Sequence, residues 1–286
     1  MKVVKISHPK KILFPKEKIS KEEVALYYLK VAKRMLPLIK DRPISMHRFP
    51  KGIKNGGFFQ KQAPETLPKW IKTTKVRRED KEAIAMILCK DKETLLWLAN
   101  QNCITPHIFL SKMGALDLPD RVIFDLDPFS SKKDFSTVVE AALGLRKILE
   151  KEMKLKAFVM TTGSKGIHVV VPILQKKYSF EKTRAFAHLV AEKLVKQNPK
   201  KFTLEMRKDK RKGRVYIDTL RNGFAQTSVA PYALRALDGA PVATPLFWKE
   251  LQDKKLRPDL YTLRTIHLRL RKNPWAGMER ARKSLP

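Results

Sequence analysis

Apolar residues follow two spacings along this chain of 286 residues. Ser20 and Glu23 stand three positions apart, as in a helix capping box, and the apolar residues after them predict a helix over residues 21–36. Beyond residue 121, short apolar runs of strand length alternate with helical stretches. This mixed order favours an α+β protein with helices against one face of a sheet. It predicts strands within 122–127, 157–162, 167–173 and 214–220, and helices near 134–151 and 180–197.

Two aspartates interrupt one of the most apolar predicted strands. Asp125 and Asp127 are two positions apart, so both side chains point to the same face. Asp218 lies in the predicted strand 214–220, and it would join them if the two strands are neighbours. Three carboxylates are hard oxygen donors that suit magnesium or manganese. The alternative, in which each aspartate caps a strand or pairs with a nearby arginine, stays open at this point.

The spelling Asp-x-Asp is also similar to the nucleophile motif of haloacid-dehalogenase-type phosphatases. In that family a Thr or Val follows two positions after the second aspartate, close to the start of the chain. Here Phe129 holds that position, and over 100 residues precede the motif. We therefore rank this interpretation below the metal site.

A turn-forming stretch joins two of the predicted strands. Residues 162–166 read Thr-Gly-Ser-Lys-Gly, and His168 follows in the next strand. Glycines allow close backbone approach, while amides, hydroxyls and Lys165 can bind phosphate oxygens. The segment lacks the spacing of a Walker A loop. Together with the aspartates it favours a triphosphate-binding turn, although a plain hairpin with a structural histidine is the alternative.

Basic and aromatic residues interleave in the turn-rich segment 43–65. Aromatic faces stack on nucleic acid bases while cations hold phosphates, so the mixture is typical of binding to single strands or exposed ends. In the alternative, Phe49 and one of the pair Phe58 and Phe59 belong to the core and the lysines are simply solvated. The residues concerned are Arg48, Lys51, Lys54 and Lys61 with Phe49, Phe58 and Phe59.

Charge changes the picture of the whole chain. There are 61 Lys and Arg residues against 28 Asp and Glu, a formal net charge of +33. Such an excess indicates a polyanionic partner, foremost a nucleic acid, with general solubility as the alternative. No apolar run reaches the roughly 18 residues of a membrane span, and the two cysteines form no zinc motif. We expect a cytoplasmic, nucleoid-associated protein without a membrane partner.

Several motifs together resemble one family over nearly the whole chain. That family is the polymerase domain of bacterial and archaeal ligase D, a nonhomologous end-joining primase-polymerase of the archaeo-eukaryotic primase superfamily. The ordered set is specific, whereas each piece alone would be weak. The motifs are HPKKILFP, RFPKG, GGFFQKQAP, FDLDP, GSKGIHVVVP, VYIDTLRN and VAPYALRALDGAPVATPL.

The resemblance implies a primase-polymerase fold with an RRM-like antiparallel catalytic sheet flanked by helices. It also implies a smaller amino-terminal module, which we place at residues 1–110, before a catalytic part at 111–286. The implied activity is that of a nucleotidyltransferase that adds nucleotides, preferably ribonucleotides, to DNA ends or gaps with two Mn²⁺ or Mg²⁺ ions. The implied partners are NTP or dNTP, DNA with a 5′-phosphate at ends, gaps or overhangs, Ku and a DNA ligase. A non-enzymatic DNA-end binder of the same fold is the alternative.

The resemblance also implies a role for individual residues. Asp125, Asp127 and Asp218 would be the catalytic metal ligands. Ser164, Lys165, His168 and Arg235 would contact the triphosphate, Thr162 and His107 the ribose 2′-hydroxyl, and Phe58 or Phe59 a base. Lys11 and Lys21 would hold the 5′-phosphate, with Arg48 also on DNA. The chain departs from the family pattern at His8, His47, Thr162 and Arg221.

Overall fold

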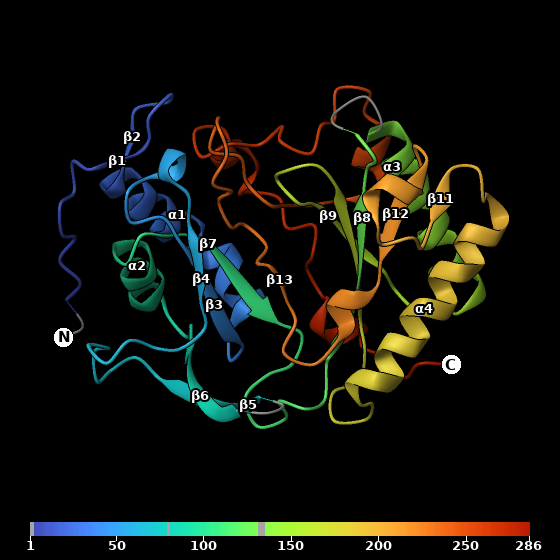
Figure 1. Cartoon of the computed structure of the whole chain (residues 1–286), viewed down its shortest axis with the longest axis horizontal. Helices are drawn as coiled ribbons and strands as arrows, with labels where there is room; N and C mark the ends of the chain where they lie inside the picture. Colours follow the sequence, from blue (N-terminus) through green and yellow to red (C-terminus); the bar gives the residue numbers. More distant parts are fainter. Residues whose placement is uncertain (1–2, 79–80, 131–134) are drawn as a thin grey trace. The chain divides into compact units, whose positions relative to one another are not determined.

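The computed structural model describes residues 3–78, 81–130 and 135–286, and Figure 1 shows their path. None of the helices in those residues combines the length and apolarity needed to cross a bilayer. The chain forms two units. Unit 1 comprises Met1–Gly114, Thr227–Ala243 and Tyr261–Lys272, and unit 2 comprises Ala115–Gln226, Thr244–Leu260 and Asn273–Pro286. The chain therefore passes between units after residues 114, 226, 243, 260 and 272, whereas the division at residue 110 stays a prediction.

Unit 1 is built on an antiparallel sheet with the strand order β13-β7-β3-β6-β5, and β4 pairs with β3. A small ribbon of β1 and β2 leads into helix α1, which packs against α2. The elements are β1 (Ile12–Phe14), β2 (Ile19–Ser20), α1 (Lys21–Ile39), β3 (Pro43–Arg48), β4 (Phe58–Gln60), β5 (Thr73–Arg78), β6 (Lys81–Leu88), α2 (Lys92–Asn100), β7 (Cys103–Phe109) and β13 (Thr227–Val229).

The predicted first helix is confirmed and begins as its capping box requires. The Ser20 hydroxyl accepts a hydrogen bond from the Glu23 amide, and the Glu23 carboxylate accepts one from the Ser20 amide. The helix continues to Ile39, three residues past its predicted end, with Pro37 inside its last turn.

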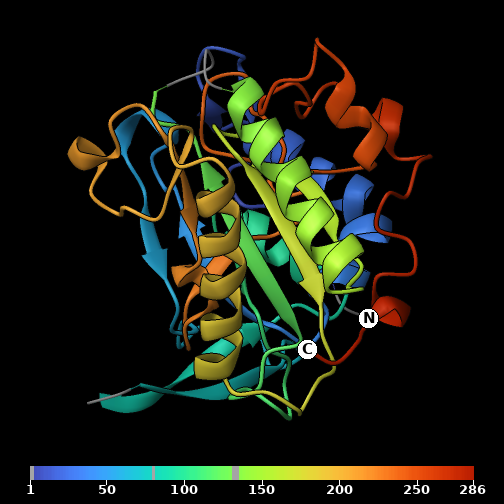
Figure 2. The ribbon, with the colours of Figure 1, turned by 90° about the vertical axis from the view of Figure 1, so that its right-hand side faces the viewer.

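Unit 2 holds a second sheet with the order β11-β12-β8-β10-β9-β14. Its pairs are antiparallel except for β11 and β12. Helices α3 and α4 contact each other and both pack on β8, as Figure 2 shows from the side of these helices. The elements are β8 (Arg121–Asp127), α3 (Phe135–Arg146), β9 (Phe158–Thr161), β10 (Ile167–Pro172), α4 (Phe180–Gln197), β11 (Phe202–Thr203), β12 (Val215–Asp218) and β14 (Thr244–Leu246).

The predicted strands and helices of this unit are confirmed with small changes. The helix expected near 134–151 is an α-helix only to Arg146 and continues as a π-helix over Lys147–Glu152. Residue 134 lies outside the described residues. The α+β class with an antiparallel sheet and helices on one face is confirmed.

Alternation along the strands places a buried apolar row directly beside the polar positions. Leu126, Ile167 and Ile217 are partners in register on three neighbouring strands and are buried. The residues before or after them in each strand point the opposite way. The apolar row stabilises the sheet. The residues next to it in sequence, which point to the other face, can therefore carry polar side chains.

Candidate functional site

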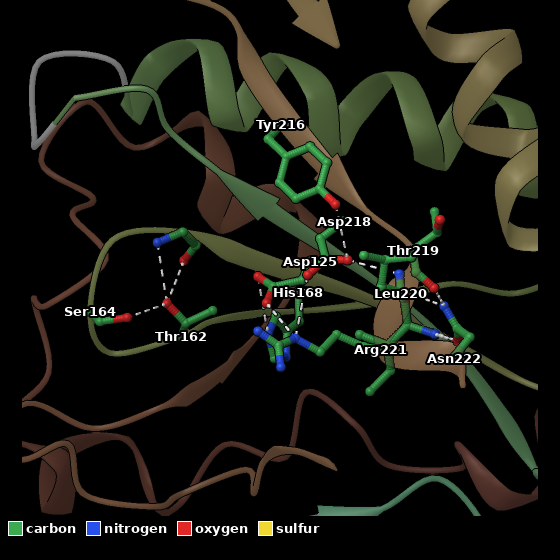
Figure 3. Close-up of polar contacts among 12 residues, drawn as sticks. Asp125, Thr162, Ser164, His168, Tyr216, Asp218, Thr219, Leu220, Arg221 and Asn222 are labelled. Carbon is green, nitrogen blue, oxygen red and sulfur yellow. Dashed lines mark hydrogen bonds and ion pairs between the residues drawn. The ribbon is translucent and has the colours of Figure 1, made fainter. Parts of the chain in front are cut away.

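Three strands of unit 2 bring polar side chains into one row. Asp218 of β12 is the partner of Asp125 on β8, and Asp125 is also the partner of His168 on β10. Asp127 points to the same face, two residues further along β8, where Tyr216 is its partner. We call Asp218, Asp125, His168 and Asp127 the acid row, and Figure 3 shows the first three of them. The sheet register thus supplies the spatial convergence that the spacing alone left open.

Each of two carboxylates in the acid row has a different contact on each oxygen. Asp125 Oδ1 lies 3.3 Å from His168 Nε2, and Asp125 Oδ2 lies 3.8 Å from Arg221 Nε. Asp218 Oδ1 accepts a hydrogen bond from the Leu220 amide at 2.7 Å and one from the Tyr216 hydroxyl at 3.4 Å. Asp218 Oδ2 lies 3.4 Å from Arg221 Nε. Arg221 therefore faces both carboxylates (Figure 3).

Burial and mutual repulsion disfavour the ionised forms of the carboxylates in this row. Burial, followed by the charge of Asp125, raises the pKa of Asp127 to about 6. Burial also raises the pKa of Asp218, and burial together with the charge of Asp218 raises the pKa of Tyr216 to about 12. A cation placed against the row would lower all three pKa values again.

The arrangement is not a closed metal-ligand set as the side chains stand. Within residues 3–78, 81–130 and 135–286, no three His, Cys, Asp or Glu side chains are grouped closely enough to hold a metal ion. The chemistry of the donors nevertheless fits a hard divalent cation, because three carboxylates share one face of the sheet.

The turn between β9 and β10 depends on Thr162 and two glycines. The Thr162 hydroxyl accepts a hydrogen bond from the Gly166 amide at 3.2 Å and lies 3.0 Å from the Ser164 hydroxyl. Gly163 has a φ of +70°, and a Cβ on Gly166 would lie 2.1 Å from the Leu126 carbonyl oxygen. The turn therefore lies against β8 beside the acid row, with Lys165 exposed at its tip.

Unit 1 contains a separate group of predicted site residues around an aromatic cluster. The rings of His47 and Phe59 stack with centroids 4.1 Å apart and 11° between their planes, and His107 meets Phe59 edge-on at 5.1 Å. Phe59 is 56% exposed and Phe58 is 49% exposed, whereas Phe49 is buried. The core alternative thus holds for Phe49 and not for the pair.

Arg235 is electrostatically linked to this cluster. Burial, followed by the charge of Arg235, lowers the pKa of His47. His107 and Arg235, which are distant in sequence, thus both neighbour His47. Sequence reasoning identified His47 only as a departure from the family pattern, because its stacking depends on the pairing of β3 with β4.

A cationic group lies at the start of α1. Lys21 is only 3% exposed, and its ammonium group donates a hydrogen bond to the Ser7 hydroxyl at 2.9 Å. Burial, followed by the charges of Lys11 and Arg48, lowers the pKa of Lys21. Arg48 also donates hydrogen bonds to the Gln101 carbonyl and the Gln60 side chain, so protein groups fix its guanidinium. These neighbouring cations suit an anionic ligand.

Arg221 and Asn222, which follow β12, were not predicted as site residues, although the arginine pairing that the sequence left open for the aspartates is present at Arg221. Arg221 contacts the acid row, and Asn222 is fully buried next to it. The Asn222 side chain accepts a hydrogen bond from the Ile123 amide at 2.8 Å and donates one to the Ile123 carbonyl at 2.7 Å. The Asn222 side chain therefore supplies hydrogen bonds to β8 beyond the point where the pairing of β12 with β8 ends. The polar residues directly after the predicted strand 214–220 were the available signal.

Comparisons with known proteins agree with this fold and donor set. Residues 20–275 match the family described as "LigD, primase-polymerase domain". The chain is 32% identical over 272 residues to the bifunctional non-homologous end joining protein LigD of Bacillus subtilis, covering 93% of this chain and 43% of that protein. It is 33% identical over 256 residues to the multifunctional non-homologous end joining protein LigD of Mycolicibacterium smegmatis, covering 89% and 33%.

A solved structure is also similar. The polymerase domain of Mycobacterium tuberculosis ligase D in complex with DNA superimposes with a TM-score of 0.91 at 27% identity, covering 100% of both chains. The fold is therefore that of a primase-polymerase domain. The chain belongs to the LigD primase-polymerase domain family. It spans less than half the length of the LigD proteins that it matches.

Proposed function

We propose that the protein is a template-dependent nucleotidyltransferase that extends DNA ends and gaps during non-homologous end joining. The observation that carries the proposal is the sheet register that puts Asp218, Asp125 and His168 side by side, with Asp127 next on the same face. The family match over residues 20–275 supports the same reaction class.

In this proposal the acid row holds two divalent cations, Mn²⁺ or Mg²⁺. Asp125, Asp127 and Asp218 are the ligands. Their shared face and the raised pKa values of Asp127 and Asp218 favour bound cations. Bound metal ions would activate the primer 3′-hydroxyl and neutralise charge on the triphosphate. Phosphoryl transfer needs little more from the protein than positioning and charge.

The other residues of unit 2 position the nucleotide. Ser164 and Lys165 donate to the triphosphate from a turn held against β8, and His168 stands beside Asp125. The Thr162 hydroxyl approaches the ribose while it closes the turn. Hydroxyl and ammonium donors at a glycine-containing turn are suited to phosphate oxygens.

Unit 1 contributes contacts to bases, sugar and DNA ends. The exposed rings of Phe58 and Phe59 offer stacking faces, and His107 lies edge-on to Phe59, where it can approach the 2′-hydroxyl. Arg235 adds a cation for the triphosphate. Lys11, Lys21 and Arg48 bind DNA, with the two lysines on the 5′-phosphate. Because the matched LigD proteins are named for end joining, we place Ku and a DNA ligase among the partners.

Loss of a carboxylate from the acid row should stop extension without stopping DNA binding. Asp125→Ala and Asp218→Ala are expected to lower nucleotide addition by at least about 10²- to 10³-fold, the scale for removing a group that stabilises transition-state charge. The assay is primer extension on a gapped duplex bearing a 5′-phosphate, with Mn²⁺ and labelled nucleotides. Asp209→Ala is the control, since Asp209 is an exposed partner of Arg207.

The same assay separates the alternatives. Extension by either acid-row variant at the wild-type rate would refute the metal-ligand assignment. A wild-type protein that shifts the DNA in a gel without extending it would be a binder rather than an enzyme. Equal rates with ribonucleotides and deoxyribonucleotides would contradict the sugar contacts of His107 and Thr162.

A further inference from the structure

Arg221 faces two carboxylates of the acid row. Its Nε lies 3.4 Å from Asp218 Oδ2 and 3.8 Å from Asp125 Oδ2. The two carboxylates come from neighbouring strands, β12 and β8, and one guanidinium faces both of them (Figure 3).

The remaining oxygens of these carboxylates face groups fixed by the fold. Asp125 Oδ1 faces His168 on β10, and Asp218 Oδ1 accepts from the Leu220 amide. Each carboxylate is therefore oriented through one oxygen, and its other oxygen is turned toward Arg221. These two oxygens, one from each carboxylate, are the ones that would become available to a cation if Arg221 moved away.

The backbone that carries Arg221 is fixed, whereas its side chain is not enclosed. Asn222 is fully buried and ties the segment to β8 through two hydrogen bonds with Ile123. Its side-chain amide also donates to the Thr219 carbonyl within the turn. The Arg221 side chain is 43% exposed. A long, half-exposed side chain on an anchored turn can leave its partners without unfolding its surroundings.

The contact is of the kind that a divalent ion can displace. Ion pairs that water reaches are weak, because solvent screens them and because the long side chain loses freedom. A divalent cation carries twice the charge and prefers carboxylate oxygens.

We propose that Arg221 is a resident counter-charge of the acid row, a positioning residue that a divalent cation must displace. In the metal-free protein its guanidinium holds Asp125 and Asp218 in place. When the cation binds, the guanidinium leaves the two oxygens that it faced. The inference rests on the proposed function, because it assumes that the acid row binds divalent cations.

The test is a titration of the full chain with Mn²⁺ in the absence of nucleotide and DNA, in which electron paramagnetic resonance measures the free ion. Arg221→Gln removes the competing charge and is expected to bind Mn²⁺ about three- to tenfold more tightly than the wild type. Arg221→Lys keeps a charge and should lie between them. Arg207→Gln removes an exposed arginine from an ion pair with Asp209 and should match the wild type. Asp218→Asn should bind Mn²⁺ more weakly.

Thermal unfolding separates displacement from an ordinary structural role. Arg221→Gln should melt at a lower temperature than the wild type without metal and at the same temperature in saturating Mn²⁺, because by then the guanidinium has left the row. An arginine that stabilises the turn in both states would lower the melting temperature equally with and without Mn²⁺, and that result would overturn the proposal.

The outcomes also distinguish this inference from the proposed function. Unchanged or weaker Mn²⁺ binding by both Arg221 variants, with Asp218→Asn still impaired, would overturn the role of Arg221 and leave the metal site standing. If Asp218→Asn and the wild type bind Mn²⁺ equally, the metal-ligand assignment fails, and the role of Arg221 fails with it.

Discussion

His47 stands at the centre of the exposed aromatic cluster, and its surroundings oppose its protonation. Phe49 and Phe59 cover the imidazole from two directions, with His107 and the charge of Arg235 nearby. Burial and the charge of Arg235 lower the pKa of His47 below its ordinary value of 6.5. A neutral imidazole can stack on Phe59 without adding charge to the face that we propose for base stacking.

The lowered pKa makes the stability of the protein depend on His47 in acid. Below pH 6.5 the unfolded chain takes up a proton that the folded imidazole resists, so His47 costs stability as pH falls from 7.5 to 5. His47→Phe keeps a stacked ring and should lose less stability over this interval than the wild type. Urea unfolding of both proteins at the two pH values measures the difference. An equal loss in both would contradict a lowered pKa at the half-buried His47.

Single residues differ in how well the sequence predicts them. The shared face of Asp125 and Asp127 follows from strand alternation, which any extended segment obeys. The contact of Arg221 with the acid row depends on how the chain turns after Asp218 and on the rotamer of the arginine. Neither of these produces a repeating pattern in the sequence from which it could be predicted. The same is true of the ring of His47, whose partner Phe59 is reached only when β4 pairs with β3.

At the scale of elements, Gly166 sets the distance between the turn that joins β9 to β10 and strand β8. The hydrogen atom that stands in place of a side chain lets the start of β10 lie directly against the Leu126 carbonyl. That contact is with backbone, which cannot rotate away as a side chain can. The turn and the acid row therefore keep their spacing only with glycine at this position.

Gly166→Ala is expected to destabilise unit 2 by about 2 kcal/mol or more, because the new Cβ would force β10 away from β8. Denaturant unfolding measures the loss, and primer extension should fall as well. Gly144→Ala is the control: it lies in α3, its Cβ would meet only the flexible end of Leu194, and alanine favours the helix. Similar stability of both variants would show that the approach of the turn to β8 is not limiting.

The helices that have strong local sequence signals lie where the sequence predicts them. The capping box places the start of α1, and the boundaries of α4 are those that its apolar spacing predicts. The change from α-helix to π-helix at Lys147 leaves the apolar spacing nearly intact and was not foreseen. The three-residue strand β13 carries too few residues to show a period, and it exists because β7 pairs with it.

The whole molecule carries a formal charge of +33, yet the three acid-row carboxylates lie together on one sheet face. Most of its lysines and arginines can contribute only sequence-independent attraction to phosphates, which salt weakens steeply. Lys21 differs from them because it is buried beside other cations. We expect it to distinguish one phosphate from the many along a DNA strand.

Lys21→Met should remove the preference for DNA ends that carry a 5′-phosphate over ends with a 5′-hydroxyl, a preference of about tenfold for one charge-assisted phosphate contact. Binding to both DNAs is compared by fluorescence anisotropy at two salt concentrations. Lys30 is an exposed lysine of the same helix. Lys30→Met should weaken binding to both DNAs by the same factor and keep the preference for the 5′-phosphate. A Lys21→Met protein that still prefers the phosphorylated end would refute this assignment.

The passage of the chain back and forth between its two units bears on how the protein can be divided. Strand β13 and the carbonyl of Tyr232, which accepts a hydrogen bond from the Tyr27 hydroxyl, belong to unit 1 although more than one hundred residues of unit 2 precede them. A fragment that stops at Gly114 would lack an edge strand and this buried hydrogen-bond acceptor. Trimming either end therefore cannot isolate one unit, and an engineered half-protein needs its three segments joined to one another after the intervening segments are removed.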